Sequence, residues 1–179
     1  MNSVQIPPGF EDFRTGDPPV RQPIRVMIAN DSAVIRRLVS EALLDAEGFE
    51  VYPAINGSDA VNQLQTARPD VLVLDTEMPV MNGVQAIRAI RELDTILPII
   101  MLCLSTESSL LAMAQAIPAG ANDVAKFTLR MGHVASAKKM LRDELLPKIR
   151  FWADLHTQKL IDSPTTNTVA LSSLETGQQ

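Results

Sequence analysis

The sequence predicts an α/β protein in which helices cover both faces of a parallel β-sheet. Five strand-like segments alternate with five helix-like segments along the chain, and parallel strands require such crossover connections. The strand-like segments are nearly continuous apolar runs, which is typical of a sheet buried on both sides. One of these runs, in the middle of the chain, ends abruptly in an aspartate. The first two observations predict the fold class, and the third indicates where a site lies.

The individual elements follow from apolar spacing and from residues that start or stop helices. Ser32 and Asp31 are credible N-caps for the first helix, and Gly48 is a credible stop. Pro147 lies inside the last helical pattern and predicts a kink or a break. In chain order, we expect strands at 24–29, 50–54, 71–75, 98–103 and 122–127, and helices between 32 and 48, at 58–67, at 82–93, from about 105 to 117 and at 131–156.

The central strand at 71–75 ends in Asp75, and a turn containing Pro79 and Gly83 follows it. In an open α/β sheet, ligands bind in the crevice at the carboxyl ends of the strands. Asp75 is therefore a candidate site residue. A helix N-cap is the alternative role, but the next helical pattern begins only near Asn82, which is too far along the chain.

Composition limits the function further. The chain has 179 residues, 46% hydrophobic residues and a net charge of -5, which predicts one globular domain without an electrostatic footprint for nucleic acid or for a membrane surface. The single cysteine excludes an intrachain disulfide. No signal segment or membrane-spanning run is present, so we expect a cytoplasmic protein. We predict a disordered lead at 1–23, a domain at 24–157 and a disordered tail or linker at 158–179.

Four sequence features together resemble a two-component response-regulator receiver domain. They are the Asn-Asp-Ser after the first strand, the Leu-Asp-Thr-Glu-Met-Pro-Val-Met-Asn-Gly at the third, the small residue ending the fourth and the Lys ending the fifth. The resemblance covers about 24–146 and is nearest to the regulatory half of chemotaxis protein-glutamate methylesterases. It implies a flavodoxin-like, doubly wound five-stranded parallel sheet of order 2-1-3-4-5 with about five helices.

The resemblance also implies roles for individual residues. Asp75 would accept a phosphoryl group from a histidine kinase as an aspartyl phosphate. Asp31, Asp75 and the backbone carbonyl of Glu77 would hold Mg²⁺, with Asn30 reaching it through a water. Lys126 would pair with the acceptor carboxylate and then with the phosphoryl group. The signal would pass to an unidentified output protein through the surface of the fourth helix, fifth strand and fifth helix.

Three residues depart from the family pattern. Asn30 replaces one of two paired acids, which predicts weaker Mg²⁺ binding. Cys103 occupies the switch position of a Ser or Thr hydroxyl, and a thiol is a poorer donor; a buried core side chain explains Cys103 equally well. Phe127 replaces the usual Pro after the lysine, so Lys126 is either the site lysine or a solvated edge-strand residue.

Two alternatives to a phosphorylated receiver remain open. The chain is either a degenerate receiver that binds partners without phosphorylation, or a regulatory fragment of a protein-glutamate methylesterase. The chain itself is not expected to be an enzyme beyond its own phosphotransfer and autodephosphorylation. An esterase needs a nucleophilic Ser, a His and an oxyanion hole, whereas His133 and His156 are the only histidines and no Gly-x-Ser-x-Gly elbow occurs. The apolar helix at 109–117 is either covered or exposed for a partner.

Overall fold

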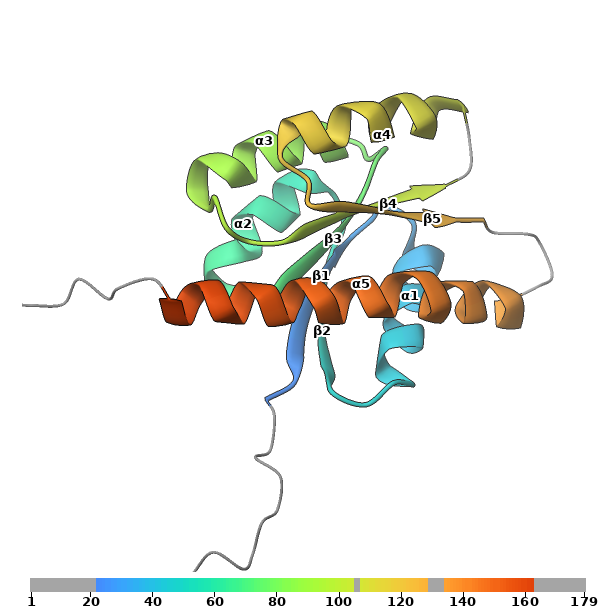
Figure 1. The fold of residues 1–179 in the computed structure, drawn as a ribbon. Helices are drawn as coiled ribbons and strands as arrows, with labels where there is room; N and C mark the ends of the chain where they lie inside the picture. Colours follow the sequence, from blue (N-terminus) through green and yellow to red (C-terminus); the bar gives the residue numbers. More distant parts are fainter. Residues whose placement is uncertain (1–21, 105–106, 129–133, 163–179) are drawn as a thin grey trace, which may run out of the picture.

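The computed structural model describes residues 22–104, 107–128 and 134–162. Five parallel strands form one sheet in the order β2-β1-β3-β4-β5 (Figure 1), which confirms the predicted fold and strand order. No predicted strand boundary is wrong by more than one residue. The strands are β1 (Ile24–Ala29), β2 (Phe49–Ala54), β3 (Val71–Asp75), β4 (Ile99–Leu104) and β5 (Asp123–Phe127).

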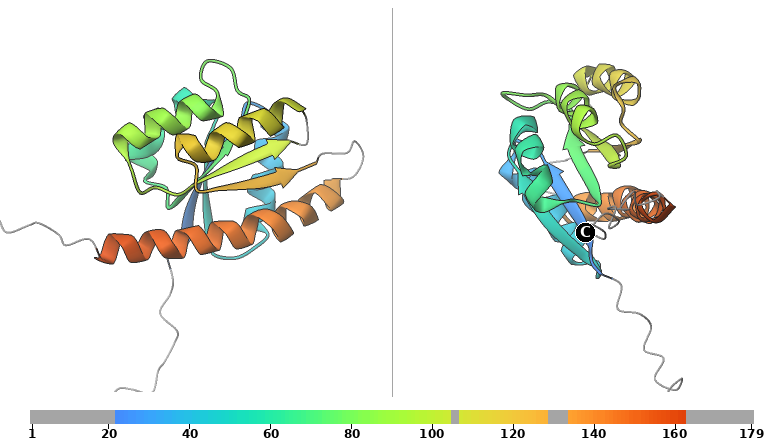
Figure 2. Two further views of the ribbon diagram at one scale, coloured as in Figure 1. Left: turned by 45° about the horizontal axis from the view of Figure 1, so that its top comes forward. Right: turned by 90° about the vertical axis from the view of Figure 1, so that its left-hand side faces the viewer.

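Helices cover both faces of this sheet (Figure 2). Helices α1 and α5 pack on one face against the inward side chains of β1, β3, β4 and β5. Helices α2, α3 and α4 cover the other face. Every side chain of β3 is therefore buried, because each face of the central strand meets a helical layer. The helices are α1 (Ala33–Leu44), α2 (Gly57–Ala67), α3 (Gly83–Leu93), α4 (Glu107–Ala119) and α5 (Val134–Asp162).

Polar side chains cap α1, α2 and α3, which follow β1, β2 and β3 at the carboxyl edge of the sheet. Ser32 accepts a hydrogen bond from the Ile35 amide at the start of α1, and Asn56 caps α2. Asn82 and Gln85 form a reciprocal capping box at the start of α3, which satisfies amides that have no partner inside the helix. These caps determine where each loop of the carboxyl edge ends.

Helix α5 continues through Pro147 as one element of 29 residues, so the predicted break is wrong. The Pro147 side chain is exposed, and water can satisfy the carbonyl that loses its partner there. The helix also runs to Asp162, so 158–162 belong to it and not to the predicted tail. Residues 1–21 and 163–179, to which the predictions of disorder apply, lie outside the described residues.

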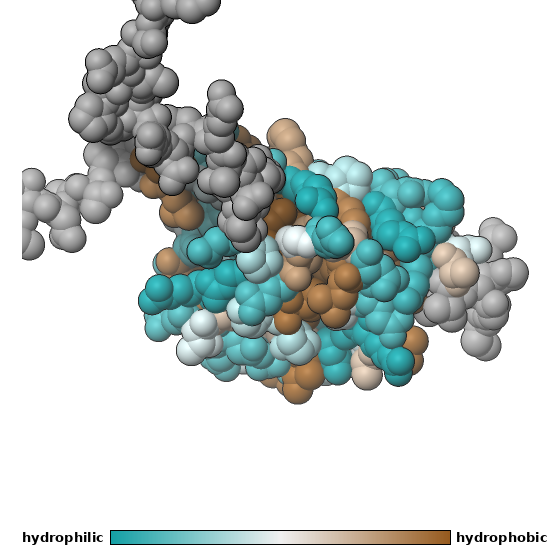
Figure 3. All heavy atoms as spheres, turned by 90° about the horizontal axis from the view of Figure 1, so that it is seen from below, coloured by the Kyte–Doolittle hydropathy of each residue, from teal (hydrophilic) through white to brown (hydrophobic). Residues whose placement is uncertain are grey.

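The face crossed by α5 is largely hydrophilic with hydrophobic areas between (Figure 3). On α5, the exposed large hydrophobic side chains are Met140, Phe151, Leu160 and Ile161. On α4, Leu111 is 66% exposed and Ile117 is 52% exposed, whereas Ala116 is buried. Part of α4 is therefore exposed rather than covered. Within the described residues, no helix combines the length and the apolar character needed to span a bilayer.

Candidate phosphoacceptor site

Asp75 is the last residue of β3 and lies at the carboxyl edge of the sheet, where only 4% of it is exposed. Both carboxylate oxygens accept hydrogen bonds. The Thr76 amide donates to Oδ1 over 2.7 Å, with its hydroxyl 3.4 Å away. The Asn30 amide nitrogen Nδ2 donates to Oδ2 over 2.6 Å. The aspartate singled out in the sequence is thus a buried carboxylate held from both sides.

The pKa of the Asp75 carboxyl is raised to about 6 because burial, the largest cause, and the nearby charge of Asp31 together outweigh the amides of Thr76 and Glu77, which lower it. Desolvation and a like charge both disfavour the carboxylate form. A cation placed between the two acids would reverse that balance. The electrostatics of Asp75 therefore fit a site that binds positive charge.

A hollow of about 480 Å³ lies at the loops that follow β1 and β3, lined by Asp31, Glu77, Met78, Pro79 and Asn82. Mg²⁺ is commonly held by one or two carboxylates, with carbonyl or water oxygens completing its octahedron. The carboxylates of Asp31 and Asp75 and the backbone of Glu77 supply that kind of donor set. Within the described residues, no group of three acidic, histidine or cysteine side chains could hold a metal, so such a site would also need backbone or water oxygens.

The loop after Asp75 returns close to it because of Gly83. The Gly83 amide donates to the Thr76 carbonyl over 3.0 Å, and a Cβ at position 83 would collide with the Asp75 carbonyl oxygen. Only glycine permits that approach. Within the same loop, the Met81 amide donates to the Pro79 carbonyl over 2.7 Å. This bond closes a tight turn whose central residue, Val80, has a φ of +69°. Val80 itself is 85% exposed.

Arg36 is a site residue that the sequence analysis missed. Its Nη1 donates to the backbone carbonyls of Asn30, over 2.7 Å, and Asp31, over 3.0 Å. The guanidinium thus fixes the loop that carries both residues. An arginine one turn inside a helix that follows a site loop can reach back to that loop. This spacing is the one feature of the sequence that could have predicted the role of Arg36.

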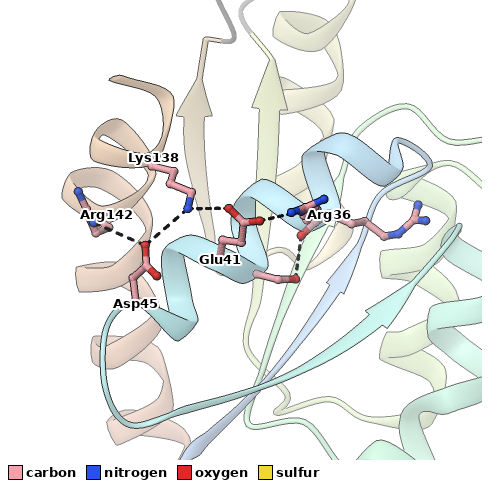
Figure 4. Close-up of polar contacts among 7 residues, drawn as sticks. Arg36, Glu41, Asp45, Lys138 and Arg142 are labelled. Atoms are coloured by element: carbon pink, nitrogen blue, oxygen red, sulfur yellow. Dashed lines mark hydrogen bonds and ion pairs between the residues drawn. The ribbon is translucent and has the colours of Figure 1, made fainter. Parts of the chain in front are cut away.

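Ion pairs join α1, the helix that carries Arg36, to α5 (Figure 4). Lys138 on α5 lies 2.6 Å from Glu41 and 3.6 Å from Asp45 on α1, and Arg142 lies 4.0 Å from Asp45. These side chains are partly exposed, so each pair contributes little stability alone. The cluster nonetheless connects the helix that holds the site loop to the last helix of the domain.

Cys103 on β4 lies opposite Lys126 on β5 in the sheet register. The pKa of the Cys103 thiol is raised to about 12, chiefly by burial and also by the charge of Asp75, and the charge of Lys126 opposes this rise. The thiol is therefore protonated at neutral pH, and it lies close enough to Asp75 and Lys126 for their charges to change its pKa. The Lys126 side chain is exposed, and no ion pair among the described residues joins it to Asp75.

The sequence matches the family of the response regulator receiver domain over residues 26–128. This chain belongs to that family. The receiver of a Thermotoga maritima CheB, seen in a crystal structure, superposes with a TM-score of 0.61 at 29% identity, covering 74% of this chain and 98% of the other. Because nearly all of that receiver is covered, the match supports the receiver fold as well as the family.

Two curated relatives are protein-glutamate methylesterase/protein-glutamine glutaminases. The relative from a Nocardioides species is 38% identical over 128 residues, which cover 71% of this chain and 35% of the relative. The relative from Caldanaerobacter subterraneus is 38% identical over 146 residues, which cover 80% of this chain and 38% of the relative. This receiver therefore spans little more than a third of the length of these relatives, and the similarity is to their regulatory part.

Proposed function

We propose that this receiver accepts a phosphoryl group on Asp75 from a histidine kinase and thereby switches a surface that an output protein binds. The observation that carries this proposal is the buried Asp75 carboxylate at the edge of the sheet, close to the charge of Asp31, which lines a surface hollow together with Glu77. A carboxylate oxygen attacks phosphorus, the bond from phosphorus to the donor nitrogen breaks, and the imidazole leaves.

Each neighbouring residue has a part in this reaction. Asp31, Asp75 and the Glu77 carbonyl would hold Mg²⁺, which would supply positive charge against the phosphoryl oxygens. Arg36 keeps the Asn30–Asp31 loop in place through its two carbonyl contacts. Lys126 lies on β5, which is separated from the strand of Asp75 by β4, and its long side chain would turn toward the phosphoryl group once that group adds negative charge.

The test is incubation with acetyl phosphate and Mg²⁺, followed by measurement of the intact mass. We expect the wild type to gain the mass of one phosphoryl group and Asp75→Asn to gain none. Asp143→Asn is the matched control, because Asp143 is an exposed acid on α5 far from the proposed chemistry. A phosphoryl group that persists in Asp75→Asn would contradict the assignment.

Output is proposed to pass through Cys103 and the neighbouring surface of α4, β5 and α5. Exposed Leu111 and Ile117 on α4 support a docking surface there. A buried thiol is a weak donor to a phosphoryl oxygen, so we expect Cys103→Ser to enlarge the phosphorylation-induced change in amide exchange over β5 and α5. An unchanged exchange response would reject a switch role for Cys103.

Constitutive binding without phosphorylation is the second candidate. It is favoured by the direct hydrogen bond from Asn30 to Asp75 and by the absence of a hydroxyl at Cys103. An unchanged mass after acetyl phosphate treatment of folded protein would support this alternative. A regulatory role toward a methylesterase domain is a further possibility, suggested by the two curated relatives; binding of this receiver to a separately produced methylesterase domain would test it.

A further inference from the structure

Asn30 directly contacts the proposed phosphoacceptor and is itself 1% exposed. Its Oδ1 accepts the Ser32 amide hydrogen over 2.8 Å, and its Nδ2 lies 2.6 Å from Asp75 Oδ2. A backbone N–H can only donate, so the oxygen of the Asn30 amide must face Ser32. The two amide hydrogens are consequently directed away from Ser32, and one of them is donated to Asp75.

This contact differs in kind from what a carboxylate at position 30 would provide. An ionised acid only accepts hydrogen bonds and would bring a like charge against Asp75. The side-chain amide of Asn30 instead donates to Asp75 Oδ2, while the backbone amide of Thr76 donates to Oδ1. Both oxygens of Asp75 are thus held by groups of the protein, without any cation.

The loop that presents Asn30 is held independently as well. Arg36 donates to the backbone carbonyls of Asn30 and Asp31. The backbone N–H of Asn30 donates to the carbonyl of Ala54 at the end of β2. The amide side chain therefore projects from an immobilised backbone, which makes its hold on Asp75 a stable part of the fold.

We propose that Asn30 is a positioning residue that holds the Asp75 carboxylate in the metal-free protein, so that a cation must compete with the amide for Oδ2. This deepens the proposed function and rests on it only in taking Asp75 as the reactive group. The Asp75 carboxylate then keeps its position with or without a divalent cation. The affinity of the site for Mg²⁺ is lower for the same reason, because the cation must displace the Asn30 amide. Phosphorylation of this receiver would consequently respond to the Mg²⁺ concentration over a higher range than in an Asn30→Asp variant.

The experiment compares wild type, Asn30→Asp and Asp31→Asn by thermal unfolding, first in EDTA and then in excess MgCl₂. Asn30→Asp should unfold about 5 °C or more below the wild type in EDTA, because a donor becomes a repelling charge, and should regain that loss with Mg²⁺. Asp31→Asn is the matched control: it removes an acid of the same pocket, should unfold no lower than the wild type in EDTA, and should show no shift with Mg²⁺.

Calorimetric titration with Mg²⁺ supplies a measurement that a purely structural role would not change. Asn30→Asp should bind Mg²⁺ about ten-fold or more tightly than the wild type. Equal affinities, or an Asn30→Asp variant as stable as the wild type in EDTA, would overturn the proposal. Neither measurement requires phosphoryl transfer, so a failed acetyl phosphate reaction alongside the expected shifts would reject only the proposed function.

Discussion

The two ends of the sheet use buried polar groups in opposite ways. At the carboxyl end, the Asp75 carboxylate is buried beside another acid and its pKa is raised. At the amino end, Arg91 donates to the carbonyls of Gly120, Asp94 and Leu97 and to the side chain of Asn122. In the part of the chain that the structure describes, the Asp75 carboxylate has no ion-pair partner, whereas the Arg91 guanidinium donates to four hydrogen-bond acceptors.

This difference separates a site for chemistry from a support for the fold. An incompletely compensated group lowers stability but is available to a cation or a phosphoryl donor. A saturated network contributes stability, and its loss leaves several acceptors without partners. Because the same sheet supports both ends, substitutions at one end and at the other should affect stability in distinguishable ways.

The largest effect is expected at the amino end. Arg91→Met should lower the free energy of unfolding by about 3 kcal/mol or more, because three carbonyls and one side-chain amide lose their donor. Urea denaturation would measure this. The matched control is Arg88→Met, an exposed arginine on the same helix, which should change stability by less than about 0.5 kcal/mol. Similar losses in both variants would contradict the support role of Arg91.

At the carboxyl end, the raised pKa of Asp75 predicts an unusual pH dependence in EDTA. The folded state binds this proton more tightly than the unfolded state, so stability should fall as pH rises from about 4 to about 6. The shift from 3.8 to about 6 corresponds to about 3 kcal/mol across that window. Denaturation at several pH values would show this fall in the wild type and its absence in Asp75→Asn.

His156 at the amino end should give a smaller effect of the opposite sign. It is 7% exposed and its Nδ1 has no described partner. Burial lowers the pKa of His156, while nearby Asp94 and Asp70 oppose that shift and Lys159 adds to it. The unfolded state therefore binds this proton more tightly, and stability should fall as pH drops through about 6.5.

His156→Leu should lack this loss. Measuring it in the Asp75→Asn background keeps the two opposite slopes apart. If acidification destabilises both proteins equally between pH 7 and pH 5, a group other than His156 is responsible.

The smallest effect is expected at Val80. A β-branched residue at φ +69° is strained by about 1 kcal/mol, and Asn adopts this conformation more readily. Val80→Asn should therefore raise the free energy of unfolding by about 1 kcal/mol, since an 85% exposed side chain loses little burial. Val34→Asn, at an exposed helical position, should give no gain. Equal responses at both positions would exclude backbone strain as the cause.

Local sequence signals were sufficient for most of the fold and for the central site residue. Apolar runs bounded by turns located all five strands, and Asp75 was recognised because it ends a run that both faces of the sheet bury. Ser32, one of the two N-cap candidates of the first helix, is indeed its cap, since capping depends on neighbours within one turn. The predicted break at Pro147 was wrong, because helix propensity is a property of the residue alone. It does not include the packing of a long helix that can accommodate an exposed proline.

The sequence by itself determined the alternating α/β plan, the family, and the presence of Asp31 and Asp75 at one edge of the sheet. Only the tertiary structure decided that the Asn30 amide donates to Asp75, that Arg36 holds the Asn30–Asp31 loop, and that Cys103 lies opposite Lys126. The physical reason is distance along the chain. Asn30 and Asp75 are 45 residues apart and meet because β1 and β3 pair side by side, and no local pattern encodes which atoms then come within hydrogen-bonding range.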